Sequence, residues 1–463
     1  MTPTFAVVGH PNKGKSSVVA TLAENEHVAI APTPRTTRRA HAYTFSVDGE
    51  VQYTLVDTPG FQRARAVLDW LEARTQNAAD RPKRVAEFVT AHRGDERFHD
   101  ECALLKPIVE GAGILYVVDG SKPYGREYDV EMKVLQWTGR PRMALINFIG
   151  SADYTEQWHR ALGQHFSIVR MFDAVRADFA ERLALLRAFC ELNEEWRATL
   201  THAIDNLQQE RHRRIVRSAR ETAALLSDAF SFVERKRLSP GTDAAAVQAQ
   251  LSGRLQQRIT LREREARQQV QHLYRHGDLQ RQEQATKILD MDLFTHEGWE
   301  LFGLSRKQLI TSSAISGALV GGGIDALVGG ASLLLGAALG ALVGGSVAWF
   351  GGDELAKVEV LGQPLGGRVL TVGPVTAPNL PWVLTGRAWV HHHLISEHNH
   401  ARRESITLAL TGRTHLMDAL PEKRRRELAG LFKQLIDGDN HEVRERLERV
   451  LAEIFEINPE PIS

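Results

Sequence analysis

Residues 9–17 bring together the side chains and glycines needed to bind a chain of phosphates. They read Gly9-His10-Pro11-Asn12-Lys13-Gly14-Lys15-Ser16-Ser17. A glycine, four variable positions and Gly-Lys-Ser form a phosphate-binding loop when a strand precedes and a helix follows. Gly14 lets backbone N–H groups turn toward an anion, Lys15 reaches phosphate oxygens, and Ser16 offers a hydroxyl to Mg²⁺. The order therefore predicts a site for a nucleoside phosphate with magnesium.

A second grouping, Asp57-Thr58-Pro59-Gly60, follows an apolar run that begins at Val51. A carboxylate at a strand end is a second oxygen ligand for Mg²⁺, and a glycine N–H three residues later can contact a γ-phosphate. We therefore expect Asp57 and Gly60 to lie beside the phosphate loop.

The elements that must position these residues follow an alternating strand and helix pattern, which is typical of an α/β fold with a mostly parallel sheet. The predicted strands are Thr4–Gly9, Tyr43–Val47, Val51–Asp57, Ile114–Asp119, Met143–Asn147 and Ile168–Phe172. Asp48-Gly49 predicts a tight turn and one antiparallel pair at an edge. Residues 61–110 exceed an ordinary connection and predict an inserted helical segment.

Together these segments resemble the translation-factor-like P-loop GTPases, in particular the branch that contains Era and TrmE. The resemblance covers residues 1–190 and implies a six-stranded G domain that binds GTP and GDP. Thr36-Thr37-Arg38 matches the first switch of that family. Thr37 is therefore expected to bind Mg²⁺ only in the triphosphate state, and Thr36 is the alternative alignment.

The resemblance assigns a role to each matching position. Lys15, Thr37 and Gly60 are the expected catalytic residues, Ser16, Thr37 and Asp57 the Mg²⁺ ligands, and Asn12 a candidate K⁺ ligand, as in the TrmE branch. The expected nucleotide-binding residues are Gly9, Asn12, Lys13, Gly14, Lys15, Ser16, Ser17, Asp57, Gly60, Asn147, Asp173 and Ala174.

Two positions depart from the family pattern. Phe61 stands where many relatives have the glutamine that orients the attacking water, so we expect slow hydrolysis without an activator. The base-reading motif Asn-Lys-x-Asp is replaced by Asn147-Phe148-Ile149-Gly150, which lacks the carboxylate that pairs with guanine. Asp153 and Asp173 are alternative carboxylates, and guanine is favoured over adenine by resemblance alone.

The rest of the chain divides into three parts. Residues 191–300 predict a helical arm, with Leu251, Leu255, Ile259 and Ala266 among its periodic apolar positions. Residues 301–352 hold the glycine-rich hydrophobic stretch. Residues 353–463 predict a small α+β unit, with strands at Lys357–Leu361, Arg368–Val372 and Trp382–Ile395 and helix over Lys423–Ile454. We interpret His391, His392 and His393 as a solvated loop or strand edge rather than a metal site.

Residues 308–350 contain a single formal charge, Asp325, and predict a helical hairpin broken at Gly321-Gly322-Gly323. Small residues four apart, such as Gly336 and Gly340, let helices pack closely in lipid. Full or partial membrane insertion and burial inside the C-terminal unit are the two alternatives.

Composition limits the partners. Lys plus Arg and Asp plus Glu are each 57 in 463 residues, so no global charge attracts nucleic acid or an anionic surface. Two cysteines, Cys102 and Cys190, and a start without a signal-peptide pattern favour the cytoplasm, with contact at the inner face of the membrane as an option.

Three functions stay open at this stage. The first is a GTPase switch coupled to a C-terminal helical, membrane-contacting region. The second is an Era-like RNA or ribosome assembly factor, and the third is a nucleotide-binding module with degenerate catalysis. The protein effector and the oligomeric state, a homo-oligomer included, are left open by the sequence.

Overall fold

The computed structural model describes residues 2–24, 28, 40–239, 241–274, 293–294, 302, 359–360, 363–364, 368–397, 416–438 and 441–457. It divides into two compact units. Unit 1 comprises 1–211 and 397–403, and unit 2 comprises 212–396 and 404–463. The division falls inside one continuous helix, α8 (Glu194–Ser231).

Unit 1 is built on the predicted six-stranded sheet, in the order β2-β3-β1-β4-β5-β6. Its strands are β1 (Thr4–Val8), β2 (His41–Val47), β3 (Glu50–Asp57), β4 (Gly113–Asp119), β5 (Arg142–Asn147) and β6 (Ile168–Met171). The edge pair β2 and β3 is antiparallel and turns at Asp48 and Gly49, which both have positive φ. The other neighbours are parallel, so the strands β1, β3, β4, β5 and β6 end at the same edge.

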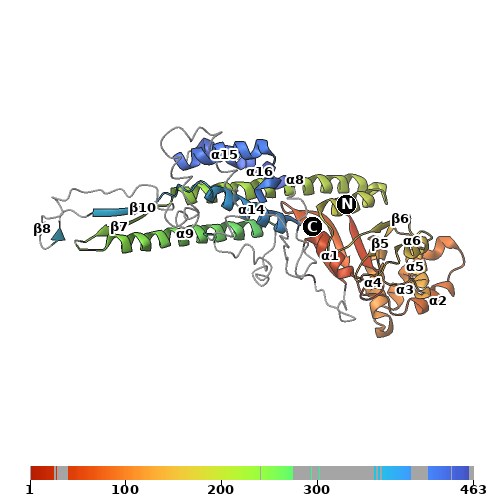
Figure 1. The fold of residues 1–463 in the computed structure, drawn as a ribbon. Coiled ribbons are helices and arrows are strands. Elements are labelled where there is room, and N and C mark those ends of the chain that lie inside the picture. The colour runs from red at the N-terminus through yellow and green to blue at the C-terminus, as the bar shows by residue number, and fades with distance from the viewer. Residues whose placement is uncertain are drawn as a thin grey trace. The chain divides into compact units, whose positions relative to one another are not determined.

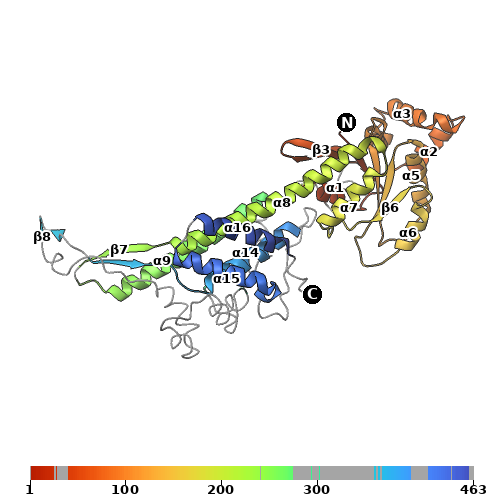
Figure 2. The same ribbon diagram turned by 90° about the horizontal axis from the view of Figure 1, so that it is seen from above.

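Both faces of this sheet are covered by helices, as Figures 1 and 2 show. Alternation along β1 sends Phe5 and Val7 to one core and Ala6 and Val8 to the other. The first core includes α1 (Lys15–Ala23), α7 (Phe179–Cys190) and the start of α8. The second includes α5 (Arg126–Trp137), α6 (Thr155–Leu162) and the helices between β3 and β4.

The long connection between β3 and β4 is helical, as predicted. It contains α2 (Ala64–Glu72), α3 (Arg81–Ala91) and α4 (His99–Val109). Their apolar positions, such as Leu68, Phe88 and Leu105, are buried in the same core as Phe61. This segment is therefore part of the packing of unit 1, and it begins directly after the glycine of the second motif.

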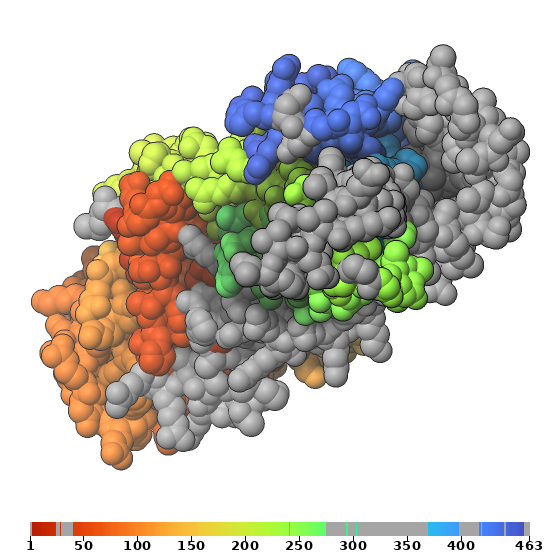
Figure 3. All heavy atoms as spheres, turned by 90° about the vertical axis from the view of Figure 1, so that its left-hand side faces the viewer, coloured from red at the N-terminus to blue at the C-terminus, as the bar shows by residue number. Residues whose placement is uncertain are grey.

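The main hydrophobic core among the described residues of unit 2 is shared by helices from distant parts of the sequence. The long helix α9 (Ala244–Leu273) buries the predicted apolar positions Leu251, Leu255, Ile259 and Ala266. They pack with α8, α14 (Leu380–Glu397), α15 (Glu422–Asp437) and α16 (His441–Glu456). Figure 3 shows the C-terminal residues, α15 and α16 among them, as blue spheres. The predicted arm and the predicted C-terminal helices therefore share one hydrophobic core.

The described residues of unit 2 also form two short sheets. β7 (Glu234–Leu238) pairs antiparallel with β10 (Arg368–Val372), and β8 (Glu359–Val360) pairs with β9 (Gln363–Pro364). β10 has the predicted bounds. β7 lies inside the span predicted as helical arm, because its charged sequence has no apolar alternation and its partner is distant in the chain.

The prediction of a strand over Trp382–Ile395 is wrong, since these residues belong to α14. Its apolar residues surround the helix because it is buried on nearly every side, and a pattern without periodicity does not separate a strand from a buried helix. The solvated position predicted for the histidines is also wrong for His391 and His392, and His393 is partly exposed. His391 and His392 are 2% and 1% exposed.

Two predictions concern residues outside the described part of the chain. Thr36, Thr37 and Arg38 are among them, and so is the whole hydrophobic stretch 308–350. Within the part that is described, none of the helices has both the length and the apolar character required to cross a bilayer.

Candidate functional site

The phosphate loop joins β1 to α1 and needs its glycines for space as well as for conformation. Gly9 and Gly14 have φ of 142° and 84°, and Asn12 also has positive φ. A Cβ on Gly9 would lie 2.4 Å from the carbonyl oxygen of Val117 in β4. The chain can therefore turn this tightly against the neighbouring strand only because residue 9 is glycine.

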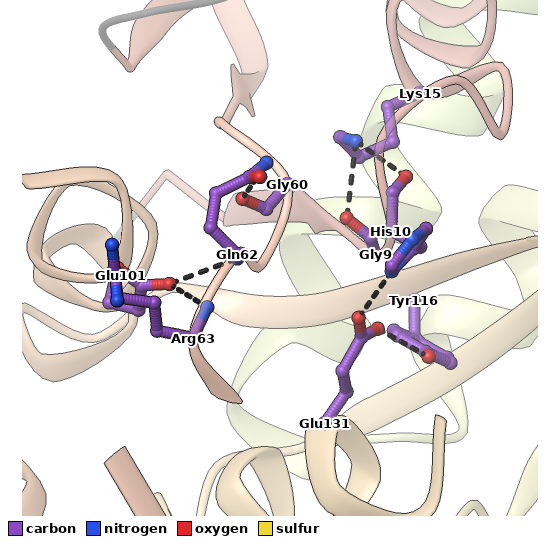
Figure 4. Close-up of polar contacts among 9 residues, drawn as sticks. All are labelled: Gly9, His10, Lys15, Gly60, Gln62, Arg63, Glu101, Tyr116 and Glu131. Atoms are coloured by element: carbon purple, nitrogen blue, oxygen red, sulfur yellow. Dashed lines mark hydrogen bonds and ion pairs between the residues drawn. The ribbon is translucent and has the colours of Figure 1, made fainter. Parts of the chain in front are cut away.

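Lys15 begins α1 and turns its side chain back across the loop (Figure 4). Its Nζ donates to the carbonyl oxygens of Gly9, at 3.2 Å, and His10, at 3.0 Å. Burial lowers the pKa of Lys15, and the carboxylate of Asp57 opposes that shift. A buried ammonium whose partners are neutral carbonyls gains from a nearby anion, so the lysine suits a phosphate group.

Ser16 and Asp57, the two described residues predicted as Mg²⁺ ligands, are in contact. The Ser16 hydroxyl donates to Asp57 Oδ2 at 2.8 Å, which joins the first turn of α1 to the end of β3. Next to Asp57, Thr58 donates to the carbonyl oxygen of Val7 at 2.7 Å and fixes the strand end. A hydroxyl and a carboxylate are oxygen ligands of the kind that Mg²⁺ prefers, so these residues fit the ion.

Gly60 lies directly against the phosphate loop. A Cβ on it would be 2.6 Å from the backbone nitrogen of Pro11. Phe61 is 2% exposed and packs into the core with the helices α2 to α4, which explains how the chain accommodates it. Gln62 is exposed, and its Nε2 lies 3.5 Å from the carbonyl oxygen of Gly60.

On the base side of the site, Asn147 connects two loops. Its Nδ2 donates to the carbonyl oxygen of Lys13 at 3.2 Å, and its Oδ1 accepts the backbone N–H of Ala174 at 3.0 Å. The carbonyl oxygen of Ala174 accepts a hydrogen bond from Thr21 of α1 at 2.6 Å. The structure thus brings together Lys13, Asn147 and Ala174, which the sequence could only propose separately.

At residue 150, where the family motif has a carboxylate, the chain has Gly150 and a different hydrogen-bond network. The N–H of Gly150 donates to Ser121 Oγ at 3.0 Å, and that hydroxyl donates to Asp119 Oδ1 at 2.5 Å. A Cβ at residue 150 would lie 3.0 Å from Ser121 Oγ. A side chain at residue 150 would therefore crowd Ser121.

The two alternative carboxylates each bind backbone of their own loop. Asp173 Oδ1 accepts the N–H groups of Val175 and Arg176, and Asp153 Oδ1 accepts that of Thr155. A guanine would have to compete with these bonds for either carboxylate. Recognition of guanine by Asp153 or Asp173 stays a prediction.

Sequence reasoning missed two buried acids beside the site (Figure 4). Glu131 of α5 lies 2.9 Å from His10 Nδ1 and accepts a 2.8 Å hydrogen bond from Tyr116. Burial, followed by the charge of Glu131, raises the pKa of Tyr116 well above its usual value. Glu101 of α4 contacts the backbone just after Gly60. No sequence signal marks either acid, because their partners are 15 to 121 residues away.

Two family models match the chain. Residues 4–148 match the model described as 50S ribosome-binding GTPase, and residues 159–450 match the model described as domain of unknown function DUF3482. The chain is 30% identical to GTPase Der of Thioalkalivibrio sulfidiphilus over 176 residues, which cover 35% of this chain and 37% of that protein. It is 45% identical to GTPase Der of Aromatoleum aromaticum over 71 residues, or 15% of this chain and 16% of that protein. These matches thus span well under half of the relatives' length.

Among solved structures, Era in complex with MgGDPNP and nucleotides of 16S ribosomal RNA matches with a TM-score of 0.30 and 16% identity. The match covers 59% of this chain and 89% of that one. Era of Aquifex aeolicus bound to GDP and AlF4⁻ matches with a TM-score of 0.29 and 15% identity, over the same shares of the two chains.

The DUF3482 model covers more than half of the chain, and the phosphate loop, Asp57 and Gly60 lie within the range matched by the GTPase model. The protein therefore belongs to the DUF3482 family and has at its N-terminus a P-loop G domain of the bacterial GTP-binding class.

Proposed function

We propose that this protein is a molecular switch that hydrolyses GTP to GDP and phosphate. The observation that carries the proposal is the convergence of Lys15, the Ser16 and Asp57 pair and Gly60 where β1 and β3 end. An ammonium, two oxygen ligands and a glycine amide are the groups that a magnesium-bound triphosphate requires.

In this proposal each residue has one task. Lys15 exchanges its bonds to the carbonyl oxygens of Gly9 and His10 for bonds to phosphate oxygens. Ser16 and Asp57, together with Thr37, would hold Mg²⁺, which when bound would supply positive charge against the phosphates. Water attacks the γ-phosphorus, the bond to the bridging oxygen breaks, and that oxygen stays on GDP while the proton passes to phosphate. The amide of Gly60 senses whether the γ-phosphate is present.

Two finer features belong to the same proposal. Asn12, exposed at the turn of the phosphate loop, contributes to a K⁺ site that speeds hydrolysis. Asn147, Asp173 and Ala174 form the base side and favour guanine. Because a placed polar group is what rejects a related base, the absence of a carboxylate at residue 150 predicts weaker discrimination against adenine than in relatives.

The C-terminal region is proposed as the output of the switch. Release of the Thr37 and Gly60 segments would change its contacts with a protein effector or, through residues 308–350, with the inner face of the membrane. An RNA or ribosome assembly role is the second candidate, supported by the match of residues 4–148 to the 50S ribosome-binding GTPase family. Retention of nucleotide without turnover is the third, supported by Phe61 in its buried position.

The test is calorimetric titration of the full chain with GTP, GDP and ATP, each with Mg²⁺, in potassium and in sodium buffer. We expect the purified protein to bind GTP and GDP, to bind ATP more weakly, and to hydrolyse GTP faster in potassium. Lys15→Ala should lower triphosphate affinity by about 100-fold, because it removes charge-assisted bonds to phosphate. Lys133→Ala, at an exposed position of α5, is the matched control.

The outcomes separate the candidates. Absence of purine triphosphate binding would refute the site. Binding without hydrolysis in single-turnover conditions would favour the non-hydrolysing module, and GTP-dependent co-sedimentation with ribosomes would favour the RNA role.

A further inference from the structure

The backbone that follows Gly60 is held by a buried acid from another helix. Glu101 lies in the first turn of α4 and is 1% exposed. Its Oε1 accepts the backbone N–H of Gln62 at 2.9 Å and that of Arg63 at 2.6 Å, as Figure 4 shows. Residue 62 is therefore bound from outside its own segment, two residues after the glycine proposed to sense the γ-phosphate.

The backbone N–H groups of Gln62 and Arg63 partly offset the free-energy cost of burying the Glu101 carboxylate. Its Oε2 is also buried and has no hydrogen-bond partner among the described residues. A carboxylate buried away from water is costly unless hydrogen-bond donors surround it. The same bonds serve α2, which starts at Ala64 and has no side-chain cap of its own, so the charge also faces the positive end of that helix.

Both ends of the segment 60–63 are thereby fixed. Gly60 contacts Pro11 of the phosphate loop so closely that no Cβ would fit, and residues 62 and 63 are bound to Glu101. Between them the side chain of Phe61 is buried in the core, and that of Gln62 is exposed and next to the Gly60 carbonyl. Gln62 therefore places a polar side chain next to Gly60, whereas the apolar side chain of Phe61 is buried in the core.

We propose that Glu101 is a positioning residue for the GTPase reaction. It holds the segment 60–63 so that the Gly60 amide stays at the phosphate loop and the Gln62 side chain stays beside it. The inserted helix α4 thereby becomes part of the hydrolytic machinery. This inference rests on the proposed function for its catalytic consequence, but the contact itself can be tested without nucleotide.

The first measurement is hydrogen–deuterium exchange of the full chain without nucleotide, in peptides that cover residues 60–64. We expect slow exchange of the Gln62 and Arg63 amides in the wild type and in Glu101→Gln, which keeps an accepting oxygen. Glu101→Ala should raise their exchange rate at least tenfold. Glu110→Ala, an exposed acid at the end of the same helix, should leave it unchanged.

The second measurement separates positioning from folding through the hydrolysis rate and the affinity for GDP. In Glu101→Ala we expect GTP turnover to fall about tenfold while the Kd for GDP changes less than about twofold, since GDP lacks the γ-phosphate near Gly60. Glu101→Gln should restore most of the turnover, because an amide oxygen can replace the carboxylate oxygen as acceptor.

Each outcome bears on the inference. Fast exchange of both amides in the wild type would overturn the contact, and normal turnover in Glu101→Ala would overturn its role in the reaction. Equal loss of GDP affinity and turnover, without rescue by Glu101→Gln, would assign Glu101 to folding alone. If the wild type binds no nucleotide, the proposed function fails, while the exchange result still decides the contact.

Discussion

Units 1 and 2 both bury charged side chains, but the partners differ. In unit 1, Lys15 and Glu101 bind backbone groups of loops, carbonyl oxygens in the first case and N–H groups in the second. In unit 2, Arg387 of α14 binds Glu263 of α9, with Nε to Oε1 at 2.6 Å and both side chains nearly inaccessible. In these examples charged side chains hold loops in unit 1 and hold two helices together in unit 2, while Glu131 of unit 1 binds the side chains of His10 and Tyr116.

The difference follows from the backbone. In loops at the ends of parallel strands, backbone N–H and C=O groups have no partner in the sheet, so a buried charged side chain can bind them. When a ligand arrives, that side chain can give up these bonds and bind the ligand instead. Helix interiors leave no such groups, so a buried charge there needs a side chain of opposite sign. We therefore expect changes in unit 1 to alter nucleotide binding and changes in unit 2 to alter stability.

The largest effect should come from Arg387→Met. Removing one partner leaves Glu263 buried without its counter-ion, so we expect a loss of about 3–5 kcal/mol in the free energy of unfolding of unit 2, measured in denaturant. Glu263→Met added to Arg387→Met should recover most of that loss. Nucleotide affinity should stay unchanged, and a fall in affinity without a fall in stability would break the comparison.

Gly14→Ala tests the opposite half of the comparison. A Cβ there would lie 2.2 Å from Asn147 Nδ2, and the φ of 84° is strained for alanine. Asn147 would have to leave Lys13 and Ala174, so affinity for GTP and GDP should fall by roughly 100-fold in calorimetry. Gly253→Ala in α9, where a Cβ would meet nothing within 4 Å beyond the helix's own backbone, should instead stabilise the protein by about 0.5–1 kcal/mol. Wild-type affinity in Gly14→Ala would contradict the geometry.

The buried histidine of unit 2 predicts sensitivity to acid. Burial, and then the charges of Arg267, His392 and Arg387, lower the pKa of His391 well below its usual 6.5. The unfolded chain therefore binds a proton that the folded chain refuses as the pH falls below 6.5. The stability that depends on neutral His391 is therefore fully present above pH 6.5. Below that pH the free energy of unfolding falls by about 1.4 kcal/mol per pH unit at most.

This pH effect is checked by comparing the free energy of unfolding at pH 7.5 and 5 in the wild type and in His391→Gln. Other groups also titrate in this range, so the difference between the two slopes is the informative quantity. Equal slopes would show that His391 does not contribute.

The smallest effect should come from a partly exposed group of three charged side chains in unit 2. Arg262 contacts Asp228 at 2.7 Å and Glu221 at 2.8 Å, which joins α9 to α8. Since water and salt screen such pairs, Arg262→Gln should cost no more than about 1 kcal/mol, and less in high salt. A loss as large as that of Arg387→Met would mean that burial does not govern the strength of these pairs.

The sequence alone determined the parts of this protein whose signals are local or periodic. The order of Gly9, Gly14, Lys15 and Ser16 defined the phosphate loop because each conformational or chemical requirement falls on a neighbouring residue. Apolar strand runs predicted the sheet, and the stripe through Leu251 and Ile259 predicted α9.

Only the tertiary structure decided the rest. α14 is a helix because its surroundings bury it on nearly every side, and β7 is a strand because it pairs with β10, which lies 130 to 138 positions later in the chain. Glu101 and Asn147 gained their partners through the fold as well. A hydrogen bond between distant residues leaves no pattern in the order of amino acids, since it depends on where the packed elements place two groups.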